Sequence, residues 1–294
     1  MRYTLRQLEV FLATAKHQNI SIAAEQLAMS QSAASSSLKE LEQQFDVQLF
    51  DRLGKRLQLS ELGRQIRPQA ENLLAQALAF EASLGDGDAL GQLNIGATLT
   101  IGNYLAVEMI AAFKQQFPAV EIGLSVDNTE KIAQRVASFE LDMGMIEGEL
   151  THPELHIEHW RNDQLQVFAA PDHPLATRRK ISDLQLIEQN WIVRESGSGT
   201  RQTFERAMQG ILPDLTISME LQHTEAIKRA VEAGLGVGCL SRISLLDAFA
   251  RGSLVPLNVP HRDFSRELYL ITHKQKYQNS ALKHWLAMCN TSSD

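Results

Sequence analysis

The polar side chains best placed for chemistry lie in short loops, each leading from a strand-like segment into a helix-like one. The richest loop is Arg194–Arg201, which contains two glycines and three hydroxyl side chains. Glycines expose backbone N–H groups, hydroxyls donate further hydrogen bonds, and the amino end of a helix is partly positive. This combination favours a small anion. The alternative is that the hydroxyls merely cap a helix.

Similar loops follow other predicted strands, and ligands of open α/β sheets bind at the carboxyl ends of strands. We therefore take as candidate ligand-binding residues Thr98, Thr100, Asn128, Glu147, Ser196, Gly197, Ser198, Gly199 and Thr200. Glu147 is the difficult member of this set, because a bare carboxylate repels an anion. It can pair with Arg194 or Lys228, stay protonated, select a protonated ligand or point away.

A second set of polar residues belongs to two short helical patterns that follow each other within residues 21–45. Ser21 is expected to cap the first helix and Ser30 the second, which should run from residue 31 to about 45. The inward face of the second helix should contain Ala34, Leu38, Leu41 and Phe45. The outward face offers groups that suit base edges and phosphates, namely Gln31, Ser32, Ser35, Ser36 and Lys39. The pattern indicates a helix-turn-helix, with an ordinary helical hairpin as the alternative.

The flanking segments favour the DNA-binding interpretation. Residues 4–17 form an amphipathic helical pattern, and residues 47–60 indicate a hairpin with Gly54 at its tip. The hairpin would expose a basic wing made of Arg52, Lys55 and Arg56. Residues 60–84 form a long helical pattern whose narrow apolar stripe suits pairing with a second copy of itself.

Composition agrees with this organisation. The net charge is −7, but residues 1–60 contain seven Lys/Arg and six Asp/Glu, and residues 52–67 contain five basic side chains and one acidic one. Positive charge for phosphate contact is thus concentrated near the wing. We expect no membrane span, no signal-peptide core and a cytoplasmic location. The two cysteines predict neither a disulfide framework nor a metal site.

Beyond residue 91, predicted strands and helices alternate, which is typical of a parallel α/β domain. Strands are expected at 92–97, 120–126, 141–146, 164–170, 191–193, 218–221, 237–240 and 267–273. Helices are expected at 103–117, 128–138, 199–209, 224–233 and 280–289. The segment 85–91 carries turn residues and marks the boundary before this domain.

These motifs together resemble the LysR-type transcriptional regulators. The residues that carry the resemblance are Leu5–Phe11, Ala23, Ala24, Leu27, Ser30–Ala33, Ser35, Leu41, Glu42, Leu49–Arg52 and Gly63. Two positions depart from the family pattern. Ser36 stands where the family often has arginine, so base preference cannot be transferred, and Ser60–Gly63 replaces a commoner Thr-x-Ala-Gly.

The resemblance implies an N-terminal all-α winged helix-turn-helix at 1–59 and a linker and dimerisation helix with a hinge at 60–90. It implies an α/β effector domain at 91–294 with two lobes like those of solute-binding proteins. Lobe 1 would span about 91–163 and 267–294, and lobe 2 about 164–266. Implied partners are double-stranded promoter DNA, a small effector, further copies of the chain as a dimer or tetramer, and RNA polymerase.

Three segments look like the sulfur-responsive branch of the family, namely Thr98–Tyr104, Ile146–Gly148 and Arg194–Arg201. That resemblance implies sulfite or a related oxyanion as effector, with a small organic carboxylate as the alternative.

Two other classes of function compete with a regulator. A stand-alone anion-binding protein would explain the carboxyl two-thirds but not the first 90 residues. An enzyme would need a nucleophile, yet no Gly-x-Ser-x-Gly motif with suitable partners occurs. Gly234–Gly238 imitates a dinucleotide loop in the wrong order, helix before strand, so we expect no cofactor. Cys239 is expected to be a buried, inert thiol.

Overall fold

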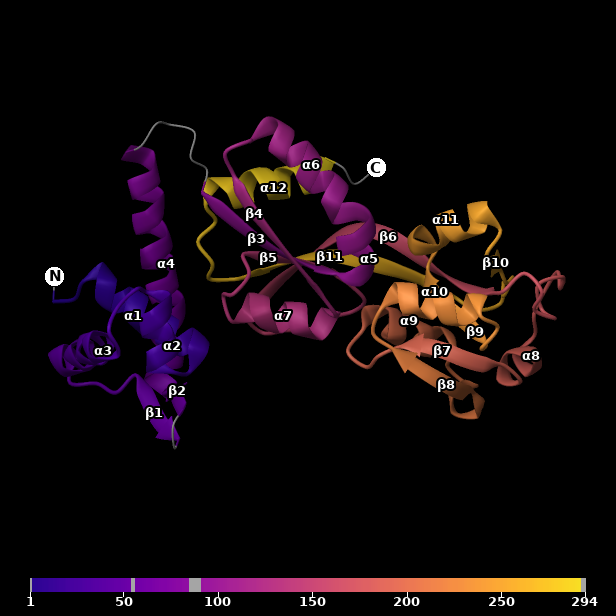
Figure 1. The fold of residues 1–294 in the computed structure, drawn as a ribbon, viewed down its shortest axis with the longest axis horizontal. Coiled ribbons are helices and arrows are strands. Elements are labelled where there is room, and N and C mark those ends of the chain that lie inside the picture. The colour runs from indigo at the N-terminus through magenta and orange to yellow at the C-terminus, as the bar shows by residue number, and fades with distance from the viewer. Residues whose placement is uncertain (1, 54–55, 85–90, 292–294) are drawn as a thin grey trace.

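The computed structural model describes residues 2–53, 56–84 and 91–291. Figure 1 shows a small helical domain at one end, a long helix beside it, and an elongated α/β domain in two lobes. Gly54 and Lys55, predicted for the tip of the wing, lie outside the described residues, as does most of the predicted boundary segment.

The amino-terminal domain is a three-helix unit with a two-stranded hairpin. Its elements are α1 (Leu5–His17), α2 (Ile20–Gln26), α3 (Gln31–Phe45), β1 (Phe50–Leu53) and β2 (Arg56–Leu59). The strands pair antiparallel, from Phe50 opposite Leu59 to Leu53 opposite Arg56. The predicted helix-turn-helix and wing are therefore present.

Capping explains where these helices begin. Ser30 accepts a hydrogen bond from the Ala33 N–H at 3.2 Å, as predicted for the cap of α3. The prediction that Ser21 caps the preceding helix is wrong, because Asn19 caps it by accepting from the N–H groups of Ser21 and Ile22. The helix begins at Ile20, one residue earlier than expected, so Asn19 stands in the cap position and Ser21 already lies in the first turn.

The core of this domain joins α1, α3 and the long helix α4 (Glu61–Leu84). Leu38 and Leu41 are buried there as predicted, but Phe45 is 44% exposed. Phe45 still faces the core side, because it lines an apolar groove with Leu8, Phe11 and Leu41 and its ring centroid lies 6.4 Å from that of Tyr3. Its inward orientation is as predicted, but it lies at the open edge of this groove and is not buried.

The carboxyl domain is built on one continuous nine-stranded sheet with the order β4-β3-β5-β11-β6-β9-β7-β8, and β10 pairs with β6. The strands are β3 (Gln92–Thr98), β4 (Glu121–Asp127), β5 (Met143–Glu147), β6 (Leu155–Ala169), β7 (Asn190–Arg194), β8 (Thr216–Leu221), β9 (Val237–Ser241), β10 (Val255–Pro256) and β11 (Ser265–His273). The β3–β4, β3–β5, β7–β8 and β7–β9 pairs are parallel.

Helices cover both lobes of this sheet. They are α5 (Leu99–Ile101), a π-helical turn η1 (Gly102–Ala106), α6 (Val107–Gln116), α7 (Thr129–Ala137), α8 (Asp183–Ile187), α9 (Gly199–Ala207), the 3₁₀ turn η2 (Leu212–Asp214), α10 (Thr224–Glu232), α11 (Arg242–Arg251) and α12 (Ser280–Thr291). Helix α11 was not predicted. Strand β6 starts nine residues before the predicted strand at 164. The prediction missed this first half because it is largely exposed and lacks a continuous apolar run.

Each lobe has its own core. In lobe 1, which contains β3–β5, α5–α7 and α12, Trp160, Phe113 and Trp285 are buried together. In lobe 2, which contains β7–β10 and α8–α11, Trp191 and Phe204 are buried together. The long antiparallel pair β6–β11 runs between the lobes, and Gln164 lies opposite Ser265 there. This pair brings the strand-to-helix loops of both lobes toward one junction.

Candidate effector site and DNA-binding surface

The amino ends of three helices meet where the two lobes join. Thr98 precedes α5, Asn128 precedes α7 and Ser198 precedes α9, and all three residues are buried. Thr100 and Thr200 lie in the first turns of α5 and α9 and are 2% and 1% exposed. The structure thus brings the predicted hydroxyls of opposite lobes into one enclosed region.

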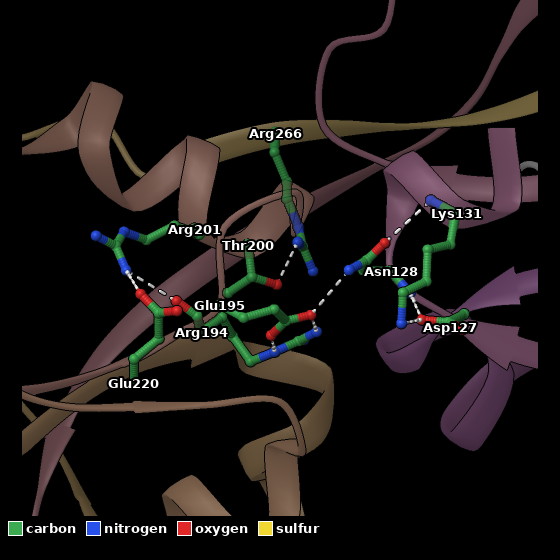
Figure 2. Close-up of polar contacts among 9 residues, drawn as sticks. All are labelled: Asp127, Asn128, Lys131, Arg194, Glu195, Thr200, Arg201, Glu220 and Arg266. Atoms are coloured by element: carbon green, nitrogen blue, oxygen red, sulfur yellow. Dashed lines mark hydrogen bonds and ion pairs between the residues drawn. The ribbon is translucent and has the colours of Figure 1, made fainter. Parts of the chain in front are cut away.

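Arg266 of β11 lies at the centre of this region, and it was not among the predicted residues. Its side chain is 1% exposed. Its Nη1 donates to Oγ1 of Thr200 at 3.0 Å and its Nη2 to Oγ1 of Thr100 at 3.4 Å, so one guanidinium contacts a hydroxyl from each lobe. Figure 2 shows the bond between Arg266 and Thr200, with Asn128 on the other side.

Two buried carboxylates neutralise Arg266. Glu147 Oε2 lies 2.5 Å from Nη2 of Arg266, and Asp163 Oδ2 lies 2.7 Å from both Nε and Nη2. Asp163 also accepts from the hydroxyl of Ser241 at 3.0 Å. One positive and two negative charges leave this trio with a net charge of −1. An anion entering here has a cation to bind, but it must compete with a carboxylate for it.

The expected alternative partners of Glu147 are engaged elsewhere. Arg194 makes a bidentate pair with Glu195, with N···O distances of 2.7 and 2.8 Å. Lys228 pairs with Glu225 at 2.6 Å. Pairing of Glu147 with Arg194 or Lys228 is therefore wrong, as is an orientation away from the junction. The carboxylate is 1% exposed and directed at Arg266.

Two hydroxyls at the junction have no hydrogen-bond partner within the described protein. Oγ1 of Thr98 and Oγ of Ser198 are both inaccessible to solvent and unpaired. Neither side chain caps the helix that it precedes. The capping alternative for the glycine-rich loop is thus wrong at Ser198, the residue that stands in the cap position. Buried polar atoms are usually paired, so these two are available to a ligand.

The remaining predicted residues play other parts. Asn128 caps α7 by accepting from the Lys131 N–H, and its Nδ2 donates to Glu195 across the junction at 3.4 Å (Figure 2). Ser196 is exposed. Gly197 has φ +82°, a conformation that favours glycine. A Cβ on Gly199 would lie 1.9 Å from the carbonyl oxygen of Glu147, so glycine here lets the lobes approach closely.

Contacts on both sides of the junction hold the lobes together. On one side, Arg206 of lobe 2 pairs with Glu149 of lobe 1 at 3.0 Å. On the other, the hydroxyl of Tyr104 donates to Glu225 at 2.7 Å. Burial and this hydrogen bond raise the pKa of Tyr104 well above its usual range, so the hydroxyl stays a donor.

A sequence signal for Arg266 exists in the alternation of β11. Strand side chains alternate between faces, so Arg266 shares a face with Leu268 and Leu270. All three are buried. An arginine in register with core leucines needs buried partners, and that pattern could have identified it as a site residue.

The polar face of α3 is open to solvent. Gln31, Ser32, Ser36 and Lys39 are exposed, and Ser35 is half-buried. Arg52 and Arg56 of the hairpin are also exposed. Ala34 and Leu38 on the opposite side of α3 fix the helix against the core, so the polar face can enter a major groove.

Neither cysteine suits metal or redox chemistry. Cys239 and Cys289 are buried, and burial raises the pKa of both thiols, that of Cys289 to about 12. Among the described residues, no cluster of His, Cys, Asp and Glu could hold a metal ion. The described helices include none with the length and apolar character required to cross a bilayer.

The geometry defines a class of protein: a winged helix-turn-helix joined by a long helix to a two-lobed effector-binding domain. Family models agree with both parts. Residues 5–64 match the bacterial regulatory helix-turn-helix of the lysR family, and residues 86–293 match the LysR substrate binding domain. The chain belongs to the LysR family and is a DNA-binding transcriptional regulator, not an enzyme.

Relatives cover the whole chain. The protein is 42% identical over 293 residues to YeiE of Escherichia coli (strain K12), described as an uncharacterized HTH-type transcriptional regulator, covering 100% of this chain and 99% of YeiE. A full-length OxyR variant of Pseudomonas aeruginosa has a TM-score of 0.74 at 22% identity, covering 99% of this chain and 95% of OxyR. The CcmR regulatory domain of Synechocystis PCC6803 in complex with 2-PG has a TM-score of 0.65 at 27% identity, covering 69% of this chain and 98% of that domain.

Proposed function

We propose that the effector of this regulator is a small oxyanion, with sulfite favoured, bound between the lobes at Arg266. The observation that carries the proposal is the enclosed set of donors around this guanidinium. The hydroxyls of Thr100 and Thr200 already contact Arg266, and those of Thr98 and Ser198 are buried without partners. An oxyanion presents several acceptor oxygens in a compact shape, which suits converging hydroxyls and one guanidinium.

Glu147 narrows the choice of anion. A fully charged oxyanion beside this carboxylate would be repelled, whereas one shared proton would turn the repulsion into a hydrogen bond. The site therefore suits an oxyanion that itself carries a proton.

A small organic carboxylate is the second candidate effector. It is favoured by the similarity to the CcmR regulatory domain, whose structure contains 2-PG. An organic carboxylate would use the same donors, but its carbon skeleton would need additional room between the lobes. A panel that contains both kinds of anion therefore shows which of them binds.

Thermal shift measurements on the purified protein test the proposal. The panel contains sulfite, sulfate, thiosulfate, phosphate, nitrate and short carboxylates. An anion at about 100 times its dissociation constant adds ~2.7 kcal/mol to stability, enough to raise the melting temperature by several degrees. A selective shift with sulfite supports the proposal, a shift with carboxylates alone supports the second candidate, and a flat panel contradicts both.

Thr98→Val locates the binding site in the same assay. Valine has the shape of threonine without the hydroxyl, and this hydroxyl makes no protein hydrogen bond, so the variant should fold normally. The anion-induced shift should be lost. Thr14→Val is the matched control, because the Thr14 hydroxyl is also buried and unpaired but lies in α1. An unchanged shift in Thr98→Val would remove this residue from the site.

The regulator is further proposed to act as a cytoplasmic homotetramer built from dimers that pair through α4, with RNA polymerase as a partner at the promoter. Several apolar side chains on α4 are exposed, namely Leu73, Leu78, Phe80 and Leu84. Leu73, Phe80 and Leu84 are seven and four residues apart and share one face, and a helix with such a stripe favours pairing with another copy. Sedimentation of the wild type and of Phe80→Glu tests this, since the charged variant should dissociate and an unchanged mass would contradict the pairing.

A further inference from the structure

The long helix α4 contacts lobe 1 of its own chain through two polar side chains. Asn72 donates from Nδ2 to the carbonyl of Gln275 at 2.5 Å, and its Oδ1 accepts from the N–H of Tyr277 at 2.6 Å. Arg67 donates to the carbonyl of Ser138. Figure 1 shows α4 standing next to this lobe. We call these five residues, together with Phe139, the linker contact.

The backbone conformation of Phe139 indicates that the linker contact is a defined packing arrangement. Its φ is +60°, a left-handed backbone conformation that is strained for a residue with a side chain. The ring is held in place by its neighbours: its centroid lies 4.1 Å from that of His273, 5.9 Å from Cζ of Arg67 and 5.7 Å from Nζ of Lys276. Such a conformation persists only where the surroundings fix it.

Two elements lead from the effector site to the linker contact. Helix α7 begins at the site, where the hydroxyl of Thr129 donates to the Glu147 carbonyl at 2.8 Å, and it ends at Ser138. Strand β11 has Arg266 near its first residue and His273, which stacks on Phe139, as its last. The Glu147–Arg266 pair and the linker contact therefore lie at opposite ends of the same two elements.

The two elements pack as one body. Ile132 and Val136 of α7 and Ile271 of β11 are completely buried in one cluster. Beneath them, a Cβ on Gly144 would lie 2.8 Å from both Ile132 and Ile271, which shows how closely helix and strand approach. A close-packed interior of this kind transmits displacement instead of absorbing it.

We propose that α7 and β11 together form the link through which occupancy of the effector site reaches α4 and the DNA-binding domain. Arg67 and Asn72 are the positioning residues, because their hydrogen bonds attach α4 to lobe 1 at the linker contact. A ligand that binds Arg266 in place of Glu147 changes the contacts at the effector-site end of α7 and β11. Because these two elements pack closely, that change displaces the residues of the linker contact at their other end. The proposal rests on the proposed function only for the identity of the ligand.

Hydrogen exchange tests the link without any ligand. In Glu147→Gln, the ion pair between residue 147 and Arg266 is lost, while that between Asp163 and Arg266 remains. We expect altered protection from hydrogen exchange at the Tyr277 amide and at the amides along α4. Glu188→Gln is the control, because it makes the same chemical change at an exposed side chain directly after α8 in lobe 2, outside the trio. Altered exchange in Glu147→Gln alone supports the link. Unaltered exchange at Tyr277 and along α4 overturns it.

A coupling measurement then tests the positioning residues. DNA affinity is measured with and without sulfite, on a duplex selected from random sequence by the wild-type protein. Asn72→Ala should keep its DNA affinity without sulfite and its sulfite-induced thermal shift. In the wild type, sulfite should change the DNA affinity by a typical allosteric factor of about 5–150. In Asn72→Ala, this factor should fall to within about twofold of one.

Gln76→Ala is the matched control on the same exposed helix, and it should keep the wild-type factor. An undiminished factor in Asn72→Ala overturns the proposal. If sulfite shifts neither protein, the choice of ligand is wrong, and the exchange experiment decides the link by itself.

Discussion

Replacing Glu147 with glutamine tests the charge balance of the effector site. Glutamine keeps the size and polarity of glutamate but removes its charge, so the trio with Arg266 and Asp163 changes from −1 to 0. A monoanion at about 4 Å from the Glu147 carboxylate meets a repulsion of ~4 kcal/mol at an effective dielectric constant of about 20. Each ~1.4 kcal/mol of repulsion corresponds to a tenfold loss of affinity.

Glu147→Gln removes this repulsion, so the variant should bind the anion more tightly than the wild type. A relief of only ~1.4 kcal/mol would already raise the affinity about tenfold.

Isothermal titration of the wild type and of Glu147→Gln with the same oxyanion, at one fixed pH, measures this difference in affinity. Glu188→Gln serves as the control, since its side chain is exposed in lobe 2 directly after α8, outside the trio. Equal affinities of the wild type and Glu147→Gln would refute the charge argument.

Four further predictions concern the DNA-binding surface, the buried ion pairs and one thiol. Lys39→Ala should weaken binding to all DNA sequences and lower the salt slope by about one, whereas Gln31→Ala should relax preference at one base position; binding curves at several salt concentrations check both. Arg266→Met leaves two buried carboxylates without their cation and should destabilise the protein by about 3–5 kcal/mol in urea unfolding, and a loss below ~1 kcal/mol would contradict the buried pairing. Cys239 should resist alkylation in the native protein near neutral pH, since burial raises the pKa of its thiol, and rapid labelling would contradict this.

Local patterns were enough to predict most of the fold. The apolar spacing of Ala34, Leu38 and Leu41 places α3 on its core. The alternation of strands and helices predicts the parallel α/β domain, whereas its division into two lobes was implied by the family resemblance. The failures have local causes. The helix α2 starts at Ile20, so Asn19 and not Ser21 stands in the cap position, and Phe45 is exposed because it lies in the last turn of α3, at the open edge of the core.

The effector site was only partly predictable, because its polar partners come from distant parts of the chain. Loop composition identified the hydroxyls of Thr98, Thr100, Ser198 and Thr200. Arg266 was missed, since no loop motif surrounds it and its function depends on being brought beside residues 66 and 166 positions away. The partner of Glu147 was predicted wrongly for the same reason.

The most direct test of the central claim is a crystal structure of the protein with the anion that gives the largest thermal shift. We expect the anion between the lobes, with its oxygens accepting from Arg266 and from the hydroxyls of Thr98 and Ser198. Glu147 should then have left its 2.5 Å contact with Arg266 or share a proton with the anion. An anion bound elsewhere, with the Glu147–Arg266 pair intact and both hydroxyls still unpaired, would contradict the account.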